Sequence, residues 1–77
     1  MEWTPESIRA LRHHLKLTQT EFGERLGVTR VQTVSEWELG KTTPGCQTIL
    51  LLDVTAREAG FTDRVAAKLR EKLTGTE

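Results

Sequence analysis

The sequence predicts a compact all-α domain built from five short helices. Signals that start and stop helices recur at short intervals along the 77 residues, and apolar residues between them repeat at helical spacing. Alternating runs that would favour β-strands are almost absent. A chain of this length forms one domain with a small core. We therefore expect a single unit over residues 1–77, without linkers or internal repeats.

The first helix is expected to start at Pro5, since proline suits the first helical position. Thr4 precedes it as a capping residue, and Trp3 can pack back onto Ile8 in the first turn. Ile8 and Leu11 then begin an apolar stripe along the helix.

The second helix repeats the same signals over a shorter stretch. Thr18 and Glu21 have the spacing of a capping box, in which each side chain bonds the other residue's backbone N–H. Gly27 is expected to end this helix in a left-handed conformation. Gly23 lies where a second helix must approach closely, because a small residue permits such an approach.

The third helix is predicted to start near Thr29, with a capping box to Gln32, and to end at Gly40. Val34 and Trp37 are expected to anchor its inner face in the core, which leaves the other face polar.

Two further helices complete the chain. The fourth spans about residues 46–59, is the most apolar of the five, and ends before Gly60. Cys46, which is the single cysteine, is expected to be a small core residue. The fifth helix spans about 62–73 and is followed by a frayed tail at 74–77. Its apolar residues, expected in the core or in a dimer contact, are Val65, Leu69 and Leu73.

Composition indicates a cytoplasmic protein without a cofactor. Eleven basic and eleven acidic residues balance, so net charge argues neither for nor against nucleic acid as a partner. No apolar run is long enough to cross a membrane, and one cysteine cannot form an internal disulfide. No phosphate-binding loop, nucleophile–base arrangement or zinc-ligand spacing is present. We therefore expect no enzyme activity and no metal site.

The second and third helices, joined by a glycine-containing turn, have the pattern of a helix-turn-helix at about residues 18–40. The pieces L-T-Q at 17–19, E-F-G-E-R-L-G-V at 21–28 and V-S-E-W-E-L-G-K at 34–41 follow in order. In this combination the chain resembles the Cro/repressor-type (XRE family) helix-turn-helix domain over residues 8–54. The resemblance implies a five-helix, lambda-repressor-like bundle that binds DNA.

The resemblance also implies roles for particular residues. Gln19 matches a glutamine that bonds a DNA phosphate and braces the recognition helix, and Lys41 matches a loop that contacts the DNA backbone. Arg12 and Glu38 match a structural pair between the first and third helices. The residues it places against DNA are Gln19, Thr29, Arg30, Gln32, Thr33, Ser35, Glu36, Lys41 and Thr43. Glutamine can bond adenine, a threonine methyl can meet that of thymine, and arginine favours guanine.

One departure from the family pattern concerns the start of the third helix. One residue more than usual separates Gly27 from Trp37, and we assign it to Arg30-Val31. If the helix starts at Thr29, Gln32 is partly occupied as a cap. If the added residue lengthens the turn, Gln32 is free to contact a base. Val31 is expected in the core, with contact to a thymine methyl as the alternative.

The sequence thus predicts a sequence-specific transcriptional regulator, acting as a repressor through occupancy of double-stranded DNA. A homodimer on a palindromic operator is expected, formed through the fourth and fifth helices. A phage repressor, a restriction–modification controller and an antitoxin fit equally well. The alternative is a protein-interaction module, such as an antitoxin subunit whose main partner is a toxin.

Overall fold

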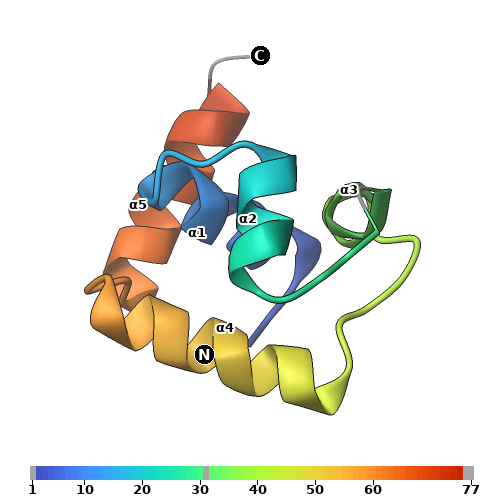
Figure 1. Ribbon diagram of the computed structural model, residues 1–77. Helices are drawn as coiled ribbons and strands as arrows, with labels where there is room; N and C mark the ends of the chain where they lie inside the picture. The colour runs from blue at the N-terminus through green and yellow to red at the C-terminus, as the bar shows by residue number, and fades with distance from the viewer. Residues whose placement is uncertain (1, 31, 76–77) are drawn as a thin grey trace.

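The computed structural model describes residues 2–30 and 32–75, with side chains up to residue 72. Within these residues the chain is all-α and contains no strand, which confirms the predicted fold class (Figure 1). The helices are α1 (Pro5–His14), α2 (Gln19–Arg25), α3 (Gln32–Leu39), α4 (Cys46–Glu58) and α5 (Asp63–Gly75).

Local sequence signals set most helix ends. Thr4 caps α1, and its capping box closes with the Ser7 hydroxyl. The predicted box of α2 is present, with Glu21 Oε1 accepting from the Thr18 N–H and Thr18 Oγ1 accepting from the Glu21 N–H. Gly27 has a φ of 73°, a left-handed conformation that glycine adopts without a steric penalty. The chain therefore turns sharply after α2, and α3 is placed beside it.

The core lies between the helices, and each of them contributes to it, α5 through Ala66. Ile8 and Leu11 of α1, Phe22 of α2, Val34 of α3 and Leu52 of α4 are the largest fully buried side chains. Each contributes about 1.5–3 kcal/mol through the removal of apolar surface from water. The expected inward direction of Val34 is confirmed, so the core fixes which side of α3 faces outward.

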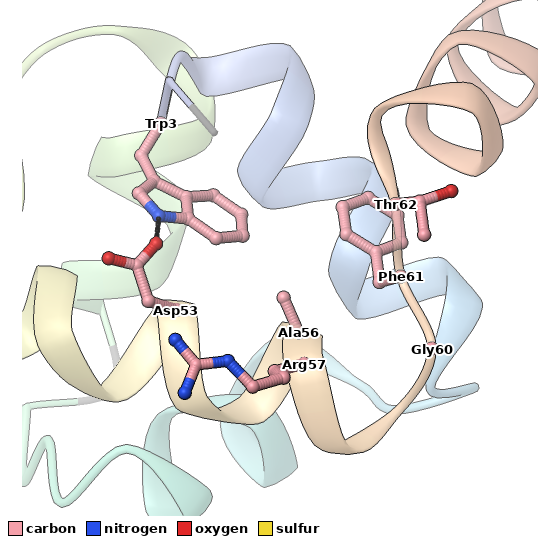
Figure 2. Close-up of a pocket in the computed structure, with 7 residues that line it drawn as sticks. All are labelled: Trp3, Asp53, Ala56, Arg57, Gly60, Phe61 and Thr62. Carbon is pink, nitrogen blue, oxygen red and sulfur yellow. Dashed lines mark hydrogen bonds between the residues drawn. The ribbon is translucent and has the colours of Figure 1, made fainter.

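The N-terminal segment closes one end of this core (Figure 2). Trp3 packs against the core cluster, and its indole Nε1 donates to Asp53 Oδ1 of α4 at 2.7 Å. The Trp3 and Phe61 rings lie 6.4 Å apart between centroids and are nearly parallel. His14 Nε2 bonds the Ala59 carbonyl at 2.9 Å. These contacts tie both ends of α1 to α4 and to the turn that follows it.

Three sequence expectations need correction. The helix α3 spans Gln32–Leu39 rather than starting near Thr29, because Thr29 and Arg30 are not helical. The helix α5 extends to Gly75, two residues past its predicted end, and includes part of the expected frayed tail. Cys46 is exposed rather than buried, because it lies on the side of α4 turned away from the buried Leu52.

Three other expectations lie outside the described residues. They are the placement of Val31, the side chain of Leu73 and the end of the predicted tail at residues 76–77.

Candidate functional site

The helices α2 and α3 approach closely at Gly23. A Cβ atom added there would lie 3.4 Å from Val34 Cγ2 and 3.8 Å from Val28 Cβ. The Val28 N–H donates to the Gly23 carbonyl at 2.8 Å, which fixes the start of the turn against the end of α2. The small residue predicted at this contact therefore lets α3 pack directly on α2.

A polar contact holds the far end of α3. Arg12 of α1 donates from Nε to Glu38 Oε2 at 2.7 Å and from Nη2 to Oε1 at 3.1 Å, and the two side chains are 14% and 6% exposed. Arg12 Nη1 also bonds the Leu17 carbonyl at 3.1 Å. Gln19 Nε2 donates to the same Glu38 carboxylate at 3.3 Å. Glu38 is thus bound from both α1 and α2, which fixes the rotation of α3.

His13 lies at the edge of this contact. Its Nε2 is 3.4 Å from Arg12 Nη2. Partial burial, and then the positive charges of Arg12 and Arg9, lower the pKa of His13, against an opposing effect of Glu38. His13 therefore favours its neutral form beside the arginine.

The outward face of α3 carries four of the predicted site residues. With Val34, Trp37 and Glu38 turned inward, the helical repeat places Gln32 and Glu36 on the opposite side, with Thr33 and Ser35 on its flanks. Gln32 is exposed, and the other three are partly exposed. No hydrogen bond is formed by the Gln32 amide within residues 2–30 and 32–75. Its donors and acceptor are therefore available.

The turn before α3 brings three further site residues together. Thr29 and Arg30 are exposed, and with Gln19 they line a hollow of about 280 Å³ between α2 and the turn. Glu24, which sequence reasoning did not single out, also lines it. Neither Thr29 nor Arg30 is helical, so their side chains do not follow the helical spacing of the α3 residues.

The last two site residues lie beyond the other end of α3. Lys41 and Thr43 are exposed in the loop to α4, and Pro44 beside them is buried. The Lys41 N–H donates to the Glu36 carbonyl at 3.0 Å, which places Lys41 directly after the last turn of α3. The site thus has one exposed cation on each side of α3, since Arg30 precedes the helix and Lys41 follows it.

Leu39 is a residue of this face that the sequence prediction missed. Its side chain is 67% exposed, although it is apolar. It follows Gln32 by seven residues and Glu36 by three, and both spacings place it on the outward face of α3. The helical repeat itself was the signal that could have identified it.

The described residues contain neither a cluster of metal-binding side chains nor a membrane-spanning helix. Within residues 2–30 and 32–75, no group of three or more histidine, cysteine, aspartate or glutamate residues is arranged to hold a metal ion. None of the helices in the same range combines the length and apolar character needed to cross a membrane.

Comparison with known protein families gives one match. A family model described as Helix-turn-helix matches residues 8–53, or 46 of the 77 residues. The match includes residues 8–14 of α1, all of α2 and α3, and residues 46–53 of α4. Searches of curated proteins and of solved structures give no significant match.

Proposed function

Because the chain belongs to the XRE-type helix-turn-helix family of DNA-binding domains, we propose that it regulates transcription by binding a specific operator sequence. The helix α3 enters the major groove, with Gln32, Thr33, Ser35 and Glu36 toward the bases. Repression then follows from occupancy of the operator, because bound protein excludes other proteins from the same DNA.

The observation that carries this proposal is how α3 is held. Its inner face is fixed by Val34 and Trp37, and Glu38 is bound by both Arg12 and Gln19. The outward face is therefore presented at a defined rotation, as base recognition requires. A polar helix face without this support would be an ordinary solvated surface.

The flanking groups suit the backbone of DNA. Arg30 and Lys41 supply positive charge on either side of α3, and Gln19 lies in the same hollow as Arg30. Glu36 can accept a bond from cytosine but repels phosphate, so it contributes to selectivity more than to affinity. Leu39 extends the same face and can contact a thymine methyl.

We further propose that two copies associate through α4 on a palindromic operator. Leu50, Leu51 and Val54 are 64%, 45% and 46% exposed, and lie on one side of this helix. By contrast, Val65 and Leu69 of α5 pack against the core. The dimer contact was expected from both α4 and α5. Because the exposed apolar surface lies on α4, we propose that α4 contributes most of it.

The test is to select duplexes from a random pool and to measure affinity for the selected site and for unrelated DNA. Gln32→Ala removes a bidentate base contact worth about 1–3 kcal/mol, roughly 5- to 150-fold in affinity. We expect that loss for the selected site and little change on unrelated DNA. Thr33→Ala is expected to change affinity in the same direction. Lys41→Ala should weaken binding to the selected site and to unrelated DNA alike. It should also reduce the salt dependence of the DNA affinity by about one counterion.

Lys68→Ala is the matched control for Lys41→Ala, since it removes an exposed lysine of α5. It should leave both affinities unchanged. The alternative, in which the domain is only a scaffold for a protein partner, predicts that no duplex is selected and that none of these substitutions alters DNA binding. A palindromic selected sequence would support the dimer, and a single half-site would contradict it.

A further inference from the structure

An open groove of about 620 Å³ lies between the end of α1 and one side of α5, away from α3. We call it the α1–α5 groove, and its lining residues are His14, Val65, Lys68, Leu69, Glu71 and Lys72. Val65 and Leu69 are half-buried against the core, whereas Lys68 and Lys72 are exposed. The groove therefore has an apolar base and a cationic edge.

One wall of the groove is rigid. His14 Nε2 bonds the Ala59 carbonyl, and because a carbonyl oxygen only accepts, Nε2 must carry the proton. The His14 ring also packs against Phe61, with centroids 5.4 Å apart. The wall is thus fixed before any partner binds, which lowers the entropic cost of binding.

Cations follow one side of α5. Arg64, Lys68 and Lys72 follow one another at intervals of four residues, so they form a stripe of like charge along the helix. Each such pair destabilises a helix by about 0.2–0.5 kcal/mol. Neither lysine forms an ion pair within the described part of the chain, and Glu71 is the single acidic residue of the lining. An anionic partner would relieve this repulsion.

Charge and position distinguish between the candidate partners. A second copy packed groove to groove by two-fold symmetry would bring Lys68 and Lys72 of both copies together, with only Glu71 of each copy to offset them, which is unfavourable. DNA bound along α3 lies elsewhere, because α3 and α5 are on opposite sides of the molecule in Figure 1. The apolar base contributed by Val65 and Leu69 also favours a protein segment over a nucleic acid.

We propose that the α1–α5 groove binds an acidic amphipathic segment of a partner protein. An apolar side chain of that segment contacts Val65 and Leu69, and its carboxylates pair with Lys68 and Lys72. The site is separate from α3, so the protein binds this segment and DNA at the same time. The inference does not depend on the proposed DNA function.

The test uses a fluorescein-labelled 12-residue peptide with leucine and glutamate at helical spacing, and measures its binding by fluorescence anisotropy. Replacing its glutamates by glutamine, or its leucines by serine, should weaken binding at least about 10-fold. Lys68→Glu combined with Lys72→Glu should do the same. Arg9→Glu combined with Arg57→Glu makes an equal charge change at exposed positions outside the groove, and should have little effect.

A charge swap makes the test specific. A peptide with lysine in place of glutamate should bind the Lys68→Glu, Lys72→Glu variant more tightly than it binds the unmodified protein. The proposal is overturned if the acidic peptide does not bind, if it binds the reversed variant equally well, or if its glutamates do not matter. It is also overturned if that variant loses DNA binding, which would make the groove a nucleic-acid contact. The DNA proposal fails separately, if no duplex is selected and Gln32→Ala leaves DNA binding unchanged.

Discussion

Replacement of Arg12 by alanine tests whether α3 is held by the contact between α1 and Glu38. The substitution removes two bonds to the Glu38 carboxylate, at 2.7 and 3.1 Å, and leaves the bond from Gln19 at 3.3 Å. It also removes the Arg12 bond to the Leu17 carbonyl. A carboxylate that is 6% exposed would then lose its compensating charge.

The expected cost follows from that burial. Breaking a buried ion pair from one side costs about 3–5 kcal/mol. Arg12 is 14% exposed, so water can enter the vacated space, and we expect the lower end, about 3 kcal/mol. A domain of this length has a total stability of about 4–12 kcal/mol. The melting temperature should therefore fall by about 12–24 °C.

Urea unfolding followed by tryptophan fluorescence measures this change, because Trp37 is buried and will report the loss of the core. Arg9→Ala is the matched control on the same helix and should cost less than about 0.5 kcal/mol. A double-mutant cycle with Glu38→Ala should give a coupling energy of about 2 kcal/mol. A coupling energy near zero, or equal costs for Arg12→Ala and Arg9→Ala, would refute this account of the contact. A changed base preference at unchanged stability would refute the structural assignment of Arg12.

Two further predictions concern stability. Gly23→Ala should stabilise the protein by up to about 1 kcal/mol, because alanine favours the helix and its Cβ fits 3.4 Å from Val34 Cγ2; a lower urea midpoint would show that the contact is already too tight. The pKa of His13 is lowered in the folded state. As the pH falls through about 6.5, the unfolded chain therefore binds more protons than the folded protein does. The free energy of unfolding, measured with urea, should therefore decrease from pH 7 toward pH 5. The decrease should be steeper in the unmodified protein than in the His13→Gln variant. An equal decrease in both would contradict the lowered pKa of His13.

Most helix ends were predictable because their causes are local. Thr4, Thr18 and the glycines after α2, α3 and α4 lie within a few residues of the ends they define, and the structure places them as expected. The inward positions of Val34 and Trp37 also follow from helical spacing and are confirmed. The family was identifiable because its motif is continuous in the sequence, and the match over residues 8–53 confirms it. The roles of the DNA-contact residues stay predictions.

The start of α3 was not predictable, because the sequence around Thr29 supports two starting points. Thr29 has the spacing of a cap to Gln32, yet the helix begins at Gln32 itself. The choice depends on contacts distant in sequence. The inner residues must reach the core, and Glu38 must meet Arg12, which lies 26 residues earlier. Those contacts fix the rotation of α3.

The exposed faces of α4 and α5 were likewise decided by tertiary structure. Apolar residues surround much of α4, so spacing alone did not indicate that Leu52 is buried while Leu50 and Cys46 are exposed. The presence of the helices, the turn chemistry between them and the family could be read from the sequence, since each depends on neighbouring residues. The packing of the helices against one another decides which apolar residues of α4 stay exposed for contact with a second copy. It also decides that the lysines of α5 lie at the edge of the α1–α5 groove.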